Sequence, residues 1–286
     1  MDVSDLLAGQ NTDGGWGYHK GSSWTEPTVF ALLALSVAGC GETDAARRAL
    51  VWLRTGQRAD GGWSPRPDVA PSTWVTALPL LLPQSAAKGF QVGAAVKWLI
   101  SEQGRESTVA ERIRAFLRGG KQQVDTSQIG WPFYPETAAW VAPTAFTLLS
   151  LDRVTYRDDV RRRCNEARSY LLSRRCADGG WNHGGYRALG YDAGSYPETT
   201  GLALLALRGR NSAVLQPSLA LATKLFGITQ SCKGACWLAL ALLAHGRRIS
   251  PELKQIRPPR SVIEQSLVVL VEAAANGNDI FLYDNS

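Results

Sequence analysis

The chain has 286 residues, of which 45% are hydrophobic, so it is long enough to bury a substantial core and lacks the composition of a disordered protein. Its formal charge of +6 comes from 31 Lys and Arg against 25 Asp and Glu, and because these basic residues are not interleaved with aromatic ones, no nucleic-acid partner is expected. The chain has five cysteines and opens MDVSDLL, without a secretory leader, which favours the cytoplasm. It has no run of eighteen consecutive apolar residues, so it is not expected to span a membrane, although one apolar face stays available for peripheral membrane contact.

Two kinds of predicted helix alternate along the chain. Some segments carry apolar residues on one face only, whereas others are apolar almost all round, and the second kind has to be buried. In chain order, the pairs are DVSDLL with 23–35, 42–56 with 70–82, 90–104 with 139–151, 157–175 with 195–207, 217–227 with 233–246, and a last pair near 251–275. About six such pairs are therefore predicted.

A short turn ending in tryptophan precedes several of the apolar helices. It reads QNTDGGW at 10–16, QRADGGW at 57–63 and CADGGW at 176–181. Glycine supplies the positive φ at which the half-polar helix stops, and the tryptophan can pack back over the end of the helices. Repetition of this unit predicts an all-α fold, a single α/α toroid of inner and outer rings that spans residues 1–286.

One insertion breaks the repeat at about 104–130. A polar segment of this length at the edge of a toroid is a candidate lid or partner surface. It contains Asp125, a candidate acid for catalysis, although an aspartate beside Ser and Thr also suits a cap or a turn.

The stretch ARRALVWLRTGQRADGGW (46–63) resembles the QW repeat of squalene-hopene and oxidosqualene cyclases. The chain is thereby similar to the terpenoid cyclase and protein prenyltransferase toroid superfamily. The resemblance implies a structural role for Gln57 and Trp63, which would tie helices together. The third copy departs from the pattern, because Arg175 stands where the glutamine would be.

Three glutamates lie where that resemblance implies catalytic acids. Class II cyclases of the superfamily protonate an alkene with the middle carboxyl of a DxDD motif, and WTEPT (24–28) and YPETT (196–200) place Glu26 and Glu198 in that frame. The segment ETAAWVA, similar to one in plant diterpene cyclases, adds Glu136. No DxDD occurs, and a glutamate in the first turn also stabilises its own helix. Parallel inner helices would bring such residues to one rim, where like charges raise a pKa.

Metal and cofactor motifs of the superfamily are missing. The segment RDDVRRR (157–163) is no DDxxD, and Gly234 stands where the zinc-binding aspartate of prenyltransferases would precede Cys236, so neither a metal nor a cofactor is expected. Lys20 and Arg66 follow the DGGW turns, and with several helix N-termini they would attract a diphosphate.

Eight aromatic residues lie in or just before the predicted inner helices. They are expected either to line a central cavity, where ring faces would stabilise a carbocation, or to fill the centre of the toroid. They are Trp24, Phe30, Trp74, Tyr134, Trp140, Phe146, Tyr196 and Trp237.

These observations leave two hypotheses for function. The first is a terpene-cyclase-like protein that binds a hydrophobic isoprenoid, a prenyl diphosphate or a squalene-type hydrocarbon, in a central cavity, with Glu198 or Glu26 as proton donor. If it is an enzyme, it is a terpene cyclase of the isomerase or lyase type, or is prenyltransferase-like. The alternative is a non-catalytic toroid that binds a partner protein or a lipid. The oligomeric state is left open.

Overall fold

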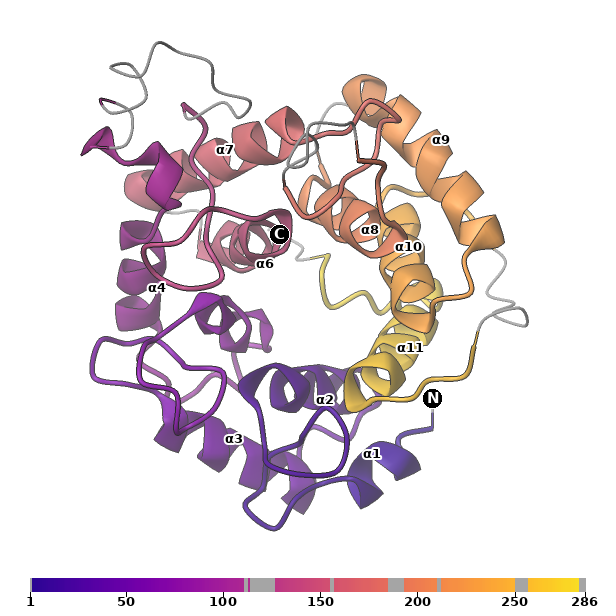
Figure 1. Ribbon diagram of the computed structural model, residues 1–286. Coiled ribbons are helices and arrows are strands. Elements are labelled where there is room, and N and C mark those ends of the chain that lie inside the picture. The colour runs from indigo at the N-terminus through magenta and orange to yellow at the C-terminus, as the bar shows by residue number, and fades with distance from the viewer. Residues whose placement is uncertain are drawn as a thin grey trace.

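Two concentric rings of helices make up the described part of the chain (Figure 1). The computed structural model describes residues 2–110, 113, 127–154, 157–184, 193–209, 212–249 and 257–282, so Asp125 and most of the insertion lie outside the described residues. Within these ranges strand pairing is limited to three isolated bridges. The predicted all-α toroid is confirmed.

The inner ring is closed by contact between the first and the last long inner helices. In chain order it contains α2 (Thr25–Val37), η1 (Trp74–Ala77), η2 (Pro79–Leu81), α6 (Val141–Leu151), α8 (Pro197–Ala206), α10 (Cys232–Ala244) and α11 (Val262–Ala275). α8 packs against both α6 and α10, α10 packs against α11, and α11 packs against α2. Nearly every residue of α2, α8 and α10 is buried, as their apolar sequences predict.

The outer ring covers the inner one with helices that bury one face. It contains α1 (Ser4–Ala8), α3 (Asp44–Gly56), α4 (Val92–Ser101), α7 (Asp158–Ser173) and α9 (Ser212–Ile228), with short turns at η3 (Arg105–Ser107) and η4 (Asp152–Val154). In α3 the buried residues are Ala46, Ala49 and Leu53, which share one side of the helix. No helix among the described residues has the length and apolarity needed to cross a membrane.

One predicted inner helix is replaced by two short turns. The segment 70–82 forms η1 and η2 instead of a continuous α-helix. Pro79 has no N–H to donate to the carbonyl four residues earlier, and its ring clashes with that carbonyl, which interrupts the helix. The two turns still bury Val75, Leu80 and Leu81 in the core.

A tryptophan joins the two rings at four places. Each indole N–H donates to a carbonyl of the preceding outer helix, in the pairs Trp16 to Leu6, Trp63 to Leu53, Trp131 to Leu99 and Trp181 to Leu171, at 2.6 to 2.8 Å. Each tryptophan backbone N–H donates to a threonine hydroxyl of the following inner segment, Thr28, Thr76, Thr144 or Thr200, at 2.9 to 3.0 Å. All four tryptophans are at most 1% exposed. Each one therefore links an outer helix to an inner segment by two buried hydrogen bonds, and we call this contact a joint.

Gly61 and Gly62 of the second turn are each needed for a different structural reason. Gly61 has φ of 89°, which a side chain would strain, and a Cβ on Gly62 would lie 2.5 Å from the Cβ of Ser72. Gln57 Nε2 then donates to the carbonyl of Gly61 at 2.9 Å and to that of Gln91, just before α4, at 3.3 Å. The predicted linking role of Gln57 and Trp63 is confirmed by these contacts.

The third turn makes the same link with a different residue. Arg175, which replaces the glutamine, donates to the carbonyl of Val214 in α9 at 3.0 Å. A long side chain with N–H groups therefore ties the turn to the next outer helix in either case.

The contribution of a joint to stability can be tested by replacing two threonines of α6, one at a time, with valine. Thr144 accepts the backbone N–H of Trp131 at 2.9 Å, whereas the hydroxyl of Thr147 is buried with no hydrogen-bond partner among the described residues. We expect Thr144→Val to lower the free energy of unfolding by about 1–3 kcal/mol, because it leaves a buried N–H unsatisfied. Thr147→Val, the matched control, should leave that free energy unchanged or raise it.

Urea denaturation of the two variants and the wild type measures these differences. Equal losses in both variants would mean that the hydroxyl contact at Thr144 does not hold the rings together.

Candidate functional site

The inner helices α2, α8, α10 and α11 place charged residues of their first turns at one rim of the toroid. We call this rim, with the loops that surround it, the mouth (Figure 1). These first-turn residues are Glu26 of α2, Glu198 of α8, Lys233 of α10 and Glu264 of α11. Lys233 interacts electrostatically with all three glutamates, so the expectation that Glu26 and Glu198 converge is met.

Lys233 forms the central ion pair of the mouth. Its Nζ lies 2.7 Å from Glu198 Oε1, and the two side chains are 34% and 42% exposed. Burial opposes the charge of Lys233, but the attraction of Glu198 and Glu26 outweighs it and raises the pKa of the ammonium. Glu198 and Lys233 are therefore held as a charged pair.

Glu26 is the buried carboxyl of the mouth. Burial raises its pKa, and the negative charge of Glu198 adds to that effect, while Lys233 and the hydroxyl of Tyr18 oppose it. The Tyr18 hydroxyl donates a hydrogen bond to Glu26 Oε2. The two candidate acids thus differ in environment, since Glu26 is pushed toward its neutral form and Glu198 is ion-paired.

Glu136 does not join this cluster. It is exposed, in a loop, with φ of 63°. Its charge acts on Glu102, at the end of the outer helix α4, whose pKa is raised first by burial and then by Asp60 and Glu136. Among the three glutamates of the sequence analysis, only Glu26 and Glu198 come together.

Three of the eight aromatic candidates pack inside the ring. Phe30, Phe146 and Trp237 are 0%, 4% and 1% exposed. Trp237 lies 5.9 Å from Phe30 and 5.6 Å from Phe146 between ring centroids, both edge-on. Phe281, from the segment after α11, lies 6.2 Å from Trp237 and is also buried. These side chains fill the centre of the ring at their level instead of lining an open cavity, because aromatic rings from several elements meet there.

The other five aromatic candidates lie at the mouth. Tyr134, Trp140 and Tyr196 are 44%, 39% and 48% exposed, and Trp24 and Trp74 are half-buried. A continuous row of rings runs from Trp74 through Phe133, Trp140 and His183 to Tyr196, with centroid distances of 5.1 to 6.2 Å. The mouth therefore has an aromatic wall that is open to solvent.

Sequence reasoning missed three residues of the mouth. Tyr18, Phe133 and His183 each stand two positions after a joint tryptophan, namely Trp16, Trp131 and Trp181. Their shared position two residues after the tryptophan of the repeat was a signal in the sequence, because each joint fixes the direction of the loop that follows it.

The two basic residues expected to attract an anion are placed differently from one another. The guanidinium of Arg66 lies 4.9 Å from the centroid of the Trp24 ring and pairs with Asp68. Lys20 is exposed to solvent.

The cysteines of α10 contact each other. A hydrogen bond between the side chains of Cys232 and Cys236 lowers the pKa of the first, and the same bond together with burial raises that of the second. All five cysteines are free. Within the described ranges, no group of three or more His, Cys, Asp or Glu is placed to hold a metal ion.

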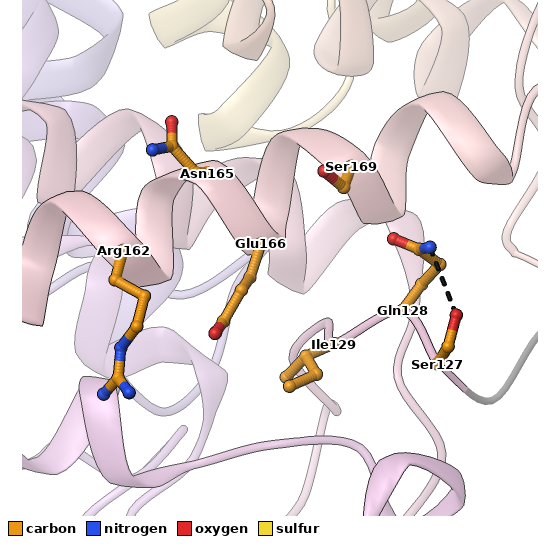
Figure 2. Close-up of a pocket in the computed structure, with 7 residues that line it drawn as sticks. All are labelled: Ser127, Gln128, Ile129, Arg162, Asn165, Glu166 and Ser169. Atoms are coloured by element: carbon orange, nitrogen blue, oxygen red, sulfur yellow. Dashed lines mark hydrogen bonds between the residues drawn. The ribbon is translucent and has the colours of Figure 1, made fainter.

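Other hollows lie outside the mouth. One of about 560 Å³ is lined by Ser127, Gln128, Ile129, Arg162, Asn165, Glu166 and Ser169. Figure 2 shows Arg162 and Glu166 extending from α7 toward the side on which Ile129 lies. Two more, of about 590 and 420 Å³, lie beside Arg247 and Val214. None of these three hollows is lined by a residue of the mouth.

Comparisons with known proteins agree with the fold and give short sequence matches. No family model matches the chain. A segment of 67 residues is 48% identical to drimenyl diphosphate synthase of Streptantibioticus cattleyicolor, covering 23% of this chain and 12% of that protein. Another of 74 residues is 38% identical to protostadienol synthase A of Arthroderma gypseum, covering 22% and 10%. The matches thus span about a tenth of the length of these relatives.

Most of the chain superimposes on a solved toroid. A GH76 α-mannanase from Bacteroides thetaiotaomicron matches with a TM-score of 0.64 over 96% of this chain and 93% of that one, at 10% identity. By fold, the chain is an α/α toroid. At this identity the likeness concerns the fold alone.

The protonation of Glu26 predicts a pH dependence of stability. Because its pKa is raised in the folded protein, the folded state holds a proton that the unfolded state releases above the ordinary value of 4.5. We expect the wild type to lose stability relative to Glu26→Gln as pH rises from 4.5 through the raised pKa, with no further change above it.

Urea unfolding of both proteins between pH 4.5 and 8 measures the difference. Glu272→Gln, which removes an exposed carboxyl from α11, serves as the control. A difference between wild type and Glu26→Gln that grows in favour of the wild type with rising pH would contradict the assignment.

Proposed function

We propose that the chain is a terpene-cyclase-like toroid that binds a hydrophobic isoprenoid at its mouth, with Glu26 as the proton donor of a protonation-initiated cyclisation. The observation that carries this proposal is the environment of Glu26, a buried carboxyl that burial drives toward its neutral form and that accepts a hydrogen bond from Tyr18, whose ring packs against Trp24. The short matches to two terpene synthases support the choice of substrate class.

The proposed chemistry begins with a neutral carboxyl. Tyr18 occupies one oxygen of Glu26, so the other oxygen would carry the proton. The π electrons of an alkene would take that proton to form a C–H bond, leaving the positive charge on the adjacent carbon and Glu26 as a carboxylate. Glu198 is unsuited to this step, because it is paired with Lys233 at 2.7 Å.

The aromatic wall would stabilise the cation that follows. Ring faces attract a positive charge without acting as nucleophiles. Trp24 contacts Tyr18 with its ring centroid 5.4 Å away, so it lies next to the proposed acid. Tyr196 and Trp140 extend the wall along the path of a long hydrocarbon chain. Transfer of a proton from a carbon next to the final cation to water or to the Glu26 carboxylate would leave a C=C bond and end the reaction.

The packed centre favours a binding site at the mouth over one deep in the ring. Phe30 has no surface accessible to water, so a substrate could reach its level only if side chains moved. We therefore assign Phe30, Phe146 and Trp237 to the floor below the substrate, with Trp24, Trp74, Tyr134, Trp140 and Tyr196 in contact with it.

A second candidate function is a non-catalytic toroid that binds a lipid or a partner protein. The observation that favours it is the same packed centre, because a cyclase has to enclose the whole folding chain away from water. In this case the exposed rings of the mouth would be the contact surface, and the buried Glu26 would only affect stability.

Product analysis separates these candidates. We expect purified protein incubated with squalene, farnesyl diphosphate or geranylgeranyl diphosphate to yield a cyclised product detectable by gas chromatography and mass spectrometry. Glu26→Gln, which keeps the shape but removes the acid, should lower the yield by at least about 100-fold. Glu272→Gln, far from the mouth on α11, should keep full activity.

The outcomes differ for each candidate. Binding of an isoprenoid without turnover of any of the three would favour the non-catalytic module. Full activity of Glu26→Gln would exclude Glu26 as the proton donor.

A further inference from the structure

The segment that follows α11 turns back into the ring, and we call its residues 277–282 the tail. The chain reverses at Gly277, whose φ is 85°, and the N–H of Asn278 donates to the carbonyl of Ala273 at 2.9 Å. Figure 1 shows this yellow segment running inside the ring of inner helices. Because α11 begins at the mouth, the tail enters the ring from the opposite end.

The tail reaches about half way along the inner helices. Asn278 Nδ2 donates to the carbonyl of Val37, the last residue of α2, at 3.3 Å. Three residues later, the ring centroid of Phe281 lies 6.2 Å from that of Trp237. Trp237 stands seven residues before Ala244, the end of α10, which corresponds to a rise of about 10 Å. Phe281 therefore lies well inside the ring.

Phe281 occupies apolar space in the centre of the ring. It is 1% exposed, and Trp237, which it contacts, packs edge-on against Phe30 and Phe146. A phenyl ring is close to one isoprene unit in size and apolarity, so the surface that holds Phe281 also suits the end of an isoprenoid chain. Without this ring, Trp237 would border an apolar cavity of the kind that takes up a small hydrocarbon.

The tail is anchored by one buried side chain. Phe281 is the only buried residue of 276–282, all of which the structure describes, and its neighbour Leu282 is 47% exposed. Asp279 Oδ1 accepts the N–H of Phe281 at 2.9 Å, whereas Asp279 Oδ2 is buried with no hydrogen-bond partner among the described residues. An unsatisfied buried oxygen costs stability. Release of the tail thus breaks few contacts and needs less free energy than unfolding of the ring.

We propose that the tail is an autoinhibitory plug, in which Phe281 occupies the inner end of the isoprenoid site and is displaced by a hydrocarbon chain that enters from the mouth. This inference rests on the proposed function and adds a regulation of the same site. With the tail in place, the centre is packed and a ligand contacts only the mouth. With the tail released, the space beside Trp237 opens, so the ring can enclose a longer part of the chain away from water.

Binding of farnesol to purified protein tests the plug. We expect Phe281→Ala to bind farnesol at least about tenfold more tightly than the wild type, because the ligand no longer competes with the phenyl ring. Leu282→Ala removes the exposed side chain next to it and should bind like the wild type. Isothermal titration calorimetry measures the three dissociation constants. A phenyl ring that only fills the core predicts the reverse, since its loss would loosen the site.

Hydrogen exchange of the wild type reports the displacement itself. We expect saturating farnesol to speed the exchange of the amides of Phe281 and Leu282 severalfold, while the amides of α3 in the outer ring stay unchanged. Mass spectrometry of peptides from both segments measures this. Asn278→Ala, which removes only the bond to Val37 at the start of the tail, should tighten farnesol binding severalfold without changing the packed centre.

The outcomes separate the plug from the proposed function. If the wild type binds farnesol but Phe281→Ala binds it no more tightly, or if farnesol leaves the tail amides unchanged or slows them, the plug is overturned and the isoprenoid site stands. If Phe281→Ala does not fold, the exchange of the wild type and the affinity of Asn278→Ala decide. If neither the wild type nor any variant binds farnesol, the proposed function fails, and the inference fails with it.

Discussion

The hydrogen-bonded tryptophan that links an outer helix to an inner one is the contact on which the rest of the structure depends. Its indole N–H is fixed by a carbonyl of the outer helix, and its backbone N–H is fixed by a threonine of the inner segment, as at Trp63 with Leu53 and Thr76. Because both bonds are buried, neither can be exchanged for water without cost. Four copies set the same spacing and direction around the ring, which brings the inner N-termini to one rim.

The site follows from that geometry. Residues of the first turns, which are far apart in sequence, become neighbours: Glu26 and Lys233 interact across more than 200 residues. The loop after each joint also leaves the tryptophan in a set direction, so Tyr18, Phe133 and His183 all reach the mouth. The structural repeat thus positions both the acid cluster and part of the aromatic wall. The residue types that the proposed function needs differ from one copy of the repeat to the next.

The two ends of the ring differ because the chain after α11 does not follow the repeat. Phe281 packs against Trp237, and Arg153 holds this segment by donating to the carbonyl of Ile280 while its other amino group donates to that of Leu81 at 2.7 Å. Asn278 adds a bond to the carbonyl of Val37 at 3.3 Å. The segment thus packs the buried Phe281 against the ring, whereas the mouth keeps exposed aromatic rings. A ligand of the ring is accordingly expected at the mouth.

The sequence by itself determined the toroid, the alternation of buried and half-buried helices, and the roles of Gln57 and Trp63, because periodicity and turn chemistry are local properties. It also placed Glu26 and Glu198 at corresponding positions of the repeat. Only the tertiary structure decided that Glu26 is buried, that Glu198 is paired with Lys233, that Glu136 lies apart, and that Phe30, Phe146 and Trp237 fill the centre. The physical reason is that burial and charge pairing depend on which distant segments meet, and segments such as 197–206 and 232–244 meet only when the ring closes.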